Sequence, residues 1–194
     1  MNRPAVFLDR DGTIVDDTGY PSRFDQLVIF PRSFEAVRLL NGAGFPVVVV
    51  TNQSGIGRGY FSEAELGDIH GRIAGAFASE GARLEAFYSC PHYALSPDPR
   101  YRIECVCRKP LPGLGLRAAA ELSLDLARSY MIGDKADDVL FGRAIGATPI
   151  LVLTGYGWEA RKKLEKGTGR LPAVSADLRE AVDWILAREK SVGI

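Results

Sequence analysis

The sequence has no excess of charge of either sign. Among its 194 residues, Lys and Arg together number 24, and Asp and Glu also number 24. Proteins that bind nucleic acid through its phosphates carry a basic excess or a basic stripe, so we expect no nucleic-acid partner. A small anionic ligand stays open, because a local group of cations is enough to bind one.

Long apolar runs are also missing. The longest, residues 45–50, is far shorter than the roughly 20 residues that a membrane-spanning helix needs. The N-terminus runs straight into a strand-like segment and shows no signal-peptide pattern. We therefore expect a cytoplasmic protein without a membrane partner. No heptad pattern or long apolar edge indicates an obligate partner chain, so a monomer is expected.

Cysteine is scarce, with three residues in the chain, and a disulfide framework is not expected. Cys105 and Cys107 are too close in sequence for an unstrained bridge. All three cysteines and one of the two histidines fall in one stretch, as Cys90, His92, Cys105 and Cys107. Three thiolates and an imidazole form a closed tetrahedral set for Zn²⁺ without an open position for catalysis. The prediction is a structural zinc that pins the long loop 90–112, and the alternative is three idle thiols.

Apolar runs alternate with helical patterns along the chain. Strands are expected at residues 5–8, 47–50, 84–89, 129–132 and 149–153, with a possible short strand at 27–30. Expected helices follow an N-cap at Ser33, follow a capping box at Ser62, and cover 114–122, 139–145 and 178–189, the last capped by Ser175 or Asp177. The basic segment 164–170 is expected to be a mobile surface segment. This order predicts a doubly wound, mostly parallel, Rossmann-like α/β sheet with helices on both faces. We expect one domain, 1–194, with the zinc loop inserted and only a minimal cap.

Two carboxylates follow the first expected strand, at Asp9 and Asp11, and Gly12 lets the backbone turn after them. Ligands of open parallel sheets gather at the carboxyl ends of the strands. The pair is therefore expected to share one mouth, the first as nucleophile or metal ligand and the second as an acid/base. The alternative is an Asp-Gly turn with solvated acids.

Polar and charged side chains also follow other expected strands. Thr51 and Asn52 follow the second strand, Asp134 follows the fourth, and Lys109 stands just before a helix. Acids from two strand ends suit a hard divalent cation, Mg²⁺, which also accepts phosphate oxygens. Thr51 would hold the phosphate and Lys109 would neutralise it. Such a site works by positioning charge, which is what phosphoryl transfer needs.

These segments resemble, in order, the four motifs of the haloacid-dehalogenase superfamily of phosphatases. The motifs are Asp9-Arg10-Asp11-Gly12-Thr13, Thr51 after an apolar strand, Lys109, and Gly133-Asp134 with Asp138 four residues on. Their order across most of the chain makes the resemblance specific. Within the superfamily, segment 51–55, the Cys/His loop and Gly133-Asp134-Lys135 are similar to the heptose bisphosphate phosphatases and their histidinol-phosphatase relatives.

The resemblance implies a two-step mechanism. Asp9 would form an aspartyl-phosphate, and Asp11 would protonate the leaving oxygen and then activate water. Mg²⁺ would be bound by the carboxylates of Asp9 and Asp134 and by the backbone carbonyl of Asp11. Thr51 and Lys109 would hold the phosphoryl oxygens. In this family the zinc is structural.

The resemblance also implies contacts to a small sugar-phosphate substrate, by Gly19, Tyr20, Asn52, Gln53, Ser54, Arg108 and Lys135. Asp138 is expected to orient Lys109 rather than bind metal, and His70 is expected on a helix surface.

The implied activity is magnesium-dependent removal of the 7-phosphate from D-glycero-D-manno-heptose 1,7-bisphosphate. A histidinol-phosphate phosphatase is the alternative within the family. Ser54-Gly55 and Asp134-Lys135 favour the heptose activity. An alternative from another class is a non-catalytic, zinc-stabilised binding module. The intact acid pair argues against that class, because a binding module does not need both acids.

Overall fold

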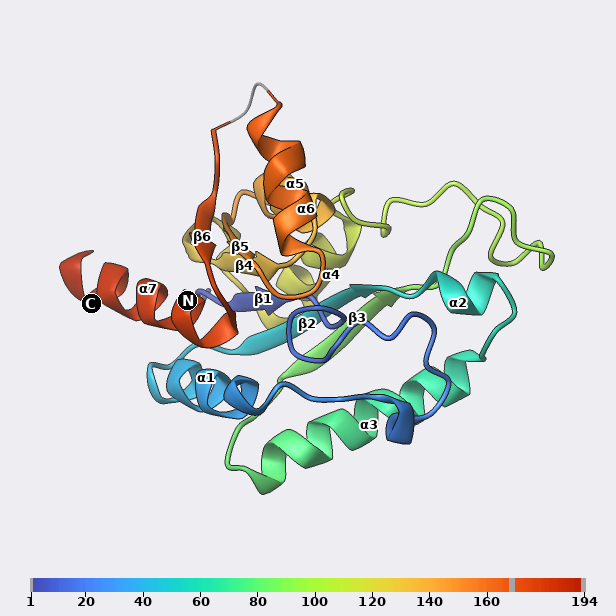
Figure 1. Ribbon diagram of the computed structural model, residues 1–194, viewed down its shortest axis with the longest axis horizontal. Coiled ribbons are helices and arrows are strands. Elements are labelled where there is room, and N and C mark those ends of the chain that lie inside the picture. Colours follow the sequence, from blue (N-terminus) through green and yellow to red (C-terminus); the bar gives the residue numbers. More distant parts are fainter. Residues whose placement is uncertain (1, 168–169, 193–194) are drawn as a thin grey trace.

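A six-stranded, fully parallel sheet forms the centre of the computed structural model, which describes residues 2–167 and 170–192. The strand order is β3-β2-β1-β4-β5-β6 (Figure 1). The strands are β1 (Val6–Leu8), β2 (Val47–Asn52), β3 (Ala86–Cys90), β4 (Tyr130–Gly133), β5 (Thr148–Val152) and β6 (Ala173–Ser175). This sheet confirms the predicted doubly wound α/β fold.

Helices cover both faces of the sheet (Figure 1). They are α1 (Pro31–Gly42), α2 (Ser54–Gly57), α3 (Glu63–Ser79), α4 (Gly113–Leu122), α5 (Ala136–Ala144), α6 (Gly157–Glu165) and α7 (Leu178–Val192). Side chains alternate along each strand, so Leu8 packs with α1, α3 and α7, whereas Phe7 packs with α4 and α5. Both side chains are fully buried, which explains the continuous apolar run of β1.

The start of α3 confirms the predicted capping box. The backbone N–H of Glu65 donates to Ser62 Oγ at 3.2 Å, and the Glu65 carboxylate accepts from the Ser62 N–H at 2.7 Å. The predicted N-cap at Ser33 is wrong, because α1 begins at Pro31, which has no N–H to lose in a first turn. Ser33 instead lies inside α1, where its hydroxyl donates to the carbonyl of Ile14 at 3.4 Å.

Several other local predictions need correction. The possible strand at 27–30 reduces to one bridge between Val15 and Ile29. The strand predicted at 47–50 extends two residues further, to Asn52, and the short helix α2 follows it. The segment 164–170 begins in α6, and residues 168–169 lie outside the described part of the chain. Ser175 belongs to β6, whereas Asp177 caps α7 by accepting from the N–H of Glu180 at 2.9 Å.

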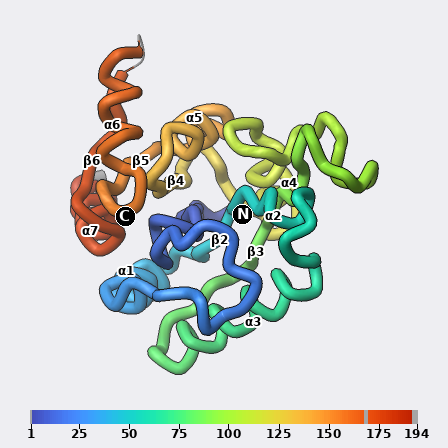
Figure 2. Tube along the Cα trace, turned by 45° about the vertical axis from the view of Figure 1, so that its right-hand side comes forward, coloured from blue at the N-terminus to red at the C-terminus, as the bar shows by residue number. Residues whose placement is uncertain are grey.

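The topology places one strand at the switch of the sheet. From β1, the chain builds outward first through β2 and β3, then on the other side through β4, β5 and β6. The crevice at the carboxyl ends of strands beside such a switch is where open α/β sheets bind ligands. Figure 2 shows the loop 91–112, in yellow-green, extending from the body of the molecule beside α2. Within residues 2–167 and 170–192, no helix is long and apolar enough to cross a membrane.

Candidate active site

Asp9 lies at the switch point, directly after β1. Its backbone N–H donates to the carbonyl of Ile132 on β4 at 2.9 Å, so the residue is still held by the sheet. Its side chain is 5% exposed. The ammonium of Lys109, from the end of the Cys/His loop, donates to Asp9 Oδ1 at 2.8 Å. The Asp9 carboxylate is therefore rigidly placed, and the ammonium of Lys109 balances its charge.

Lys109 uses all three of its ammonium donors. Besides Asp9, they reach Asp138 Oδ1 at 2.6 Å and the carbonyl of Val50 at 2.8 Å. Burial alone lowers the pKa of this lysine, but the carboxylates of Asp138 and Asp9 outweigh that effect and hold the pKa above its ordinary value. The site therefore contains a permanent buried cation beside Asp9.

Asn52 fixes the backbone of Lys109. Its side-chain amide donates to the carbonyl of Lys109 at 3.0 Å and accepts from the N–H of Lys109, also at 3.0 Å. This reciprocal pair joins the end of β2 to a residue 57 positions later in the chain. The amide of Asn52 thus uses one N–H and its oxygen on Lys109, and the substrate contact expected from the sequence stays a prediction.

Asp134 follows β4 and is fully buried. Its Oδ2 accepts from the N–H of Tyr156 at 2.8 Å, whereas its Oδ1 has no hydrogen-bond partner among the described residues. Burial, and then the nearby charge of Asp9, raises the pKa of Asp134 to about 7. Two glycines make room for the carboxylate, since a Cβ on Gly12 or Gly155 would stand 2.2 or 2.3 Å from its Oδ2.

The donor set around Asp134 fits a divalent cation. Carboxylate oxygens of Asp9, Asp134 and Asp138 lie within 4.8 Å of one another. Both oxygens of Asp138 are already engaged, one by Lys109 and the other by the backbone N–H of Lys135 at 2.9 Å. Asp9 and Asp134 are therefore the carboxylates left to bind, and the unpartnered buried oxygen of Asp134 is what a hard cation such as Mg²⁺ would satisfy.

Asp11 stands two residues beyond Asp9 and is held by its neighbours. The guanidinium of Arg10 donates to both carboxylate oxygens, with Nε 3.0 Å from Oδ1 and Nη2 2.9 Å from Oδ2. The amide of Gln53 donates to Oδ2 at 2.8 Å. Burial raises the pKa of Asp11, and Asp9 raises it further, against the lowering effect of Arg10. A raised pKa suits a carboxyl group that gives and takes protons.

Gln53 and Thr51 connect this carboxylate to the end of β2. The Gln53 amide also donates to Thr51 Oγ1 at 2.8 Å, and both side chains are buried. Ser54 follows as the first residue of α2 and is 9% exposed. The amide nitrogen of Gln53 thus donates to Asp11 and Thr51, and the expected contact of this residue with substrate stays a prediction.

The expected substrate residues of the first loop lie at its surface. Gly19 is exposed with a φ of +90°, and Tyr20 packs edge-on against Tyr60 with 4.9 Å between ring centroids. Among the described residues, neither hydrogen-bonds to the cluster of Asp9 and Lys109. Lys135 is tied to the same loop, because its ammonium donates to Asp17 Oδ2 at 2.9 Å.

The four Cys and His side chains of the loop form one cluster. Their donor atoms lie within 4.8 Å of one another. Cys90 Sγ is 3.7 Å from Cys105 Sγ, and His92 Nδ1 is 3.2 Å from Cys107 Sγ. Three sulfurs and one imidazole nitrogen at this spacing are compatible with a tetrahedral zinc.

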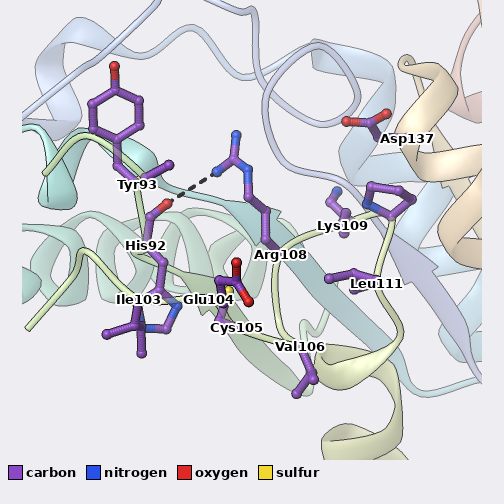
Figure 3. A pocket seen from close by; sticks show the side chains of 12 residues that line it. His92, Tyr93, Ile103, Glu104, Cys105, Val106, Arg108, Lys109, Leu111 and Asp137 are labelled. Atoms are coloured by element: carbon purple, nitrogen blue, oxygen red, sulfur yellow. Dashed lines mark hydrogen bonds between the residues drawn. The ribbon is translucent and has the colours of Figure 1, made fainter.

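The cluster adjoins a cavity of about 710 Å³ that reaches Lys109 and Asp137 (Figure 3). Arg108 lies at its rim between the cluster and Lys109, and its guanidinium donates to the carbonyl of His92 at 3.4 Å. The Arg108 side chain is exposed, so its charge is available to a ligand in this cavity.

Known proteins are similar to this chain over nearly its whole length. A family model described as HAD-hydrolase-like matches residues 106–181. A Vibrio cholerae protein named D-glycero-beta-D-manno-heptose-1,7-bisphosphate 7-phosphatase is 39% identical over 98% of this chain and 100% of its own length. The chain belongs to this phosphatase family.

Two solved structures of the family agree with the fold. The B. bronchiseptica D,D-heptose 1,7-bisphosphate phosphatase, complexed with magnesium and phosphate, has a TM-score of 0.82 and 35% identity, covering 95% of this chain and 99% of its own. The Burkholderia thailandensis D,D-heptose 1,7-bisphosphate phosphatase has a TM-score of 0.68 and 35% identity over the same shares. These comparisons confirm the relationship to the heptose bisphosphate phosphatases that the sequence motifs indicated.

Sequence reasoning missed two side chains beside this family's site. Arg10 is 1% exposed, and His70 faces inward, with its Nε2 3.4 Å from Arg10 Nη1. His70 is half-buried on α3, so the expectation of a helix-surface residue missed its contact with Arg10. Its spacing from Leu66, Ile73 and Phe77, which form the buried face of α3, was the signal that pointed inward.

Proposed function

We propose that the protein is a magnesium-dependent phosphatase that removes the 7-phosphate of D-glycero-β-D-manno-heptose 1,7-bisphosphate. The observation that carries the proposal is the Asp9 carboxylate, paired with Lys109 and close to the unpartnered buried oxygen of Asp134, in a chain of this family. The β anomer is chosen because the names of the similar curated proteins specify it.

In the first step, a carboxylate oxygen of Asp9 attacks phosphorus and forms the aspartyl-phosphate bond. The bond between phosphorus and the C7 oxygen breaks, and that oxygen receives the proton carried by Asp11. In the second step, a water molecule attacks phosphorus and passes a proton to Asp11. The bond from Asp9 to phosphorus breaks, so inorganic phosphate leaves and both aspartates return to their starting forms.

The charges around Asp9 support this chemistry. Asp9, Asp134 and the backbone carbonyl of Asp11 would hold Mg²⁺, which when bound neutralises phosphoryl oxygens. Lys109 places a positive charge 2.8 Å from Asp9 Oδ1. The hydroxyl of Thr51, buried at the end of β2, would accompany Lys109 in binding the phosphoryl group.

The remaining parts of the substrate would be bound by the loops around the site. Arg108 at the rim of the cavity and Lys135 at the start of α5, where it pairs with Asp17, would bind the second phosphate. Tyr20, Gly19 and Ser54 would contact the sugar. Asn52 and Gln53 hold Lys109 and Asp11, and we keep both residues as proposed substrate contacts.

We also propose that Cys90, His92, Cys105 and Cys107 bind a structural Zn²⁺. Four protein ligands complete a tetrahedral shell, so the metal would have no open position for substrate. Its function would be to close the loop that ends in Arg108 and Lys109.

The test is a side-by-side measurement of kcat/KM for phosphate release with Mg²⁺. Substrates are the β and α anomers of the heptose bisphosphate and histidinol phosphate. We expect the β anomer to be preferred, and Asp9→Asn to lose at least about 1,000-fold in kcat while keeping the fold. Preference for histidinol phosphate would overturn the substrate but keep the chemistry. An active Asp9→Asn variant would remove Asp9 as the nucleophile.

A further inference from the structure

Arg10, the residue between the two site aspartates, is among the largest fully buried side chains of the protein. A buried guanidinium is costly unless it is paired and hydrogen-bonded. Its Nε donates to Asp11 Oδ1 at 3.0 Å, and its Nη2 lies 2.8 Å from Oδ1 and 2.9 Å from Oδ2. The planar fork is thus committed to one carboxylate, and such bidentate pairs fix geometry as well as energy.

His70 holds the opposite edge of the guanidinium. Its Nε2 is 3.4 Å from Arg10 Nη1, and its ring stacks on Phe87 of β3 with 4.5 Å between centroids and 21° between planes. Burial, and then the charge of Arg10, lowers the pKa of His70 to about 3, so the ring is neutral and its Nε2 accepts from Arg10. The imidazole is fixed by α3 and β3 and in turn limits where the guanidinium can lie.

The donors around Asp11 are divided unequally between its two oxygens. Oδ1 accepts from Arg10 alone, through Nε at 3.0 Å and Nη2 at 2.8 Å. Oδ2 accepts from Nη2 at 2.9 Å and from the amide of Gln53 at 2.8 Å. Two residues thus fix the plane of the carboxylate, and Arg10 contacts both of its oxygens.

We propose that Arg10, held in place by His70, is a positioning residue that orients the Asp11 carboxylate for proton transfer to the leaving oxygen. The inference rests on the proposed phosphatase function and names a residue that acts through Asp11 rather than on the substrate. The role of Arg10 is to fix the position of the Asp11 carboxylate rather than to stabilise the fold. A buried ion pair changes the free energy of unfolding little compared with an apolar pair of the same volume.

The prediction concerns the leaving group. A sugar alkoxide needs the proton of Asp11, whereas p-nitrophenolate is stable enough to leave without it. Misplacing Asp11 should therefore reduce kcat/KM for the sugar phosphate and spare kcat/KM for p-nitrophenyl phosphate. A residue that only supports the fold would affect both substrates equally.

The experiment compares the two substrates in four variants of this chain and in one control variant. Arg10→Lys keeps the charge and removes the fork, and Arg10→Met removes both. His70→Phe removes the acceptor for Nη1, and His70→Gln retains an acceptor. Arg102→Met is the matched control, because Arg102 is an exposed arginine outside the site.

We expect Arg10→Lys and Arg10→Met to lose about 100-fold in kcat/KM for the sugar phosphate, with the loss in kcat and not in KM. The loss for p-nitrophenyl phosphate should be several-fold at most. His70→Phe should show a smaller loss of the same selective kind, and His70→Gln should recover most of it. Arg102→Met should match the wild type on both substrates.

Equal losses on the two substrates, a rise in KM alone, unchanged rates or a gain in rate would each overturn the proposal. If Arg10→Met does not fold, the milder Arg10→Lys and His70→Phe decide the question. The wild type separates the two levels of inference. A wild type that hydrolyses neither ester defeats the proposed function and this inference with it, whereas an active wild type with unselective losses defeats this inference alone.

Discussion

The carboxylate of Asp138 and the ammonium of Lys109 are 2.6 Å apart and almost completely excluded from solvent. The second oxygen of Asp138 accepts the backbone N–H of Lys135, so the first turn of α5 holds the lysine that faces Asp9. Gly133 makes this approach possible, since a Cβ there would lie 2.3 Å from the Asp138 carboxyl group. The helix after β4 and the loop after β3 therefore meet at one ion pair.

Replacing Asp138 with Asn should damage stability and activity together. The change leaves a buried lysine with one carboxylate instead of two, and breaking a buried pair costs about 3–5 kcal/mol. Lys109 would then bind Asp9 more tightly and make it a weaker nucleophile, so kcat should fall at least about 10-fold. Urea unfolding and steady-state kinetics measure the two effects.

Asp137→Asn, next in sequence and without an ion pair among the described contacts, should change the unfolding free energy by no more than about 0.5 kcal/mol. An unchanged unfolding free energy in Asp138→Asn would contradict the prediction.

Gly12→Ala should remove the magnesium response, because the new Cβ would stand 2.2 Å from Asp134 Oδ2. The backbone there also has a φ of +83°, which an L side chain rarely adopts. The matched control is Gly146→Ala, with a φ of +79° and open space around the Cβ. Both variants should lose about 1–2 kcal/mol of stability from backbone strain, but only Gly12→Ala should lose activity and affinity for Mg²⁺. Magnesium titrations of the two variants that overlap would refute this account.

Loss of one thiolate should empty the proposed zinc site. Cys105→Ser is expected to abolish the one equivalent of zinc that elemental analysis should find in the wild type purified without added metal. The melting temperature and kcat should both fall, because the loop that delivers Lys109 is no longer closed. Glu104→Gln, an exposed neighbour, is the control and should keep zinc, stability and rate. A folded wild type without zinc, or a zinc-free variant with full activity and unchanged melting temperature, would rule out the structural role.

His70 should make the fold sensitive to mild acid. Its pKa is lowered by burial, and then by Arg10, from 6.5 to about 3 in the folded protein. Between these values the unfolded chain binds a proton and the folded chain does not, so stability is present above pH 6.5 and is lost as pH falls toward 3. Lowering the pH from 6.5 to 5 should cost about 2 kcal/mol through this residue. Unfolding free energies of the wild type and His70→Gln at pH 7.5 and 5 should reveal the difference, and equal slopes would show that His70 does not contribute.

The strongest sequence signals correspond to the most buried elements. The run Val47–Val50 and the capping box at Ser62 led directly to β2 and α3. By contrast, α6 and β6 were missed for a physical reason. Helix α6 buries only Gly157 and Ala160, and β6 is three residues long at the edge of the sheet. Neither presents enough apolar side chains to produce a recognisable period.

The residues of the site could be predicted where reactive side chains directly follow a strand. The structure brings together Asp9, Asp134 and Lys109, although their order along the chain says nothing of distance. The partners of polar side chains were not predictable in this way. The amides of Asn52 and Gln53 bind Lys109 and Asp11, and these partners are determined by the packing of segments that are distant in sequence.

The Cys/His cluster has a consequence for how this family can diversify. It brings the two ends of segment 93–104 together, with His92 Nδ1 3.2 Å from Cys107 Sγ, while Asn52 separately anchors Lys109. The cost of closing a loop rises by only about 0.6 kcal/mol for each doubling of its length. We therefore expect segment 93–104 to accept inserted or exchanged residues while Lys109 keeps its position beside Asp9.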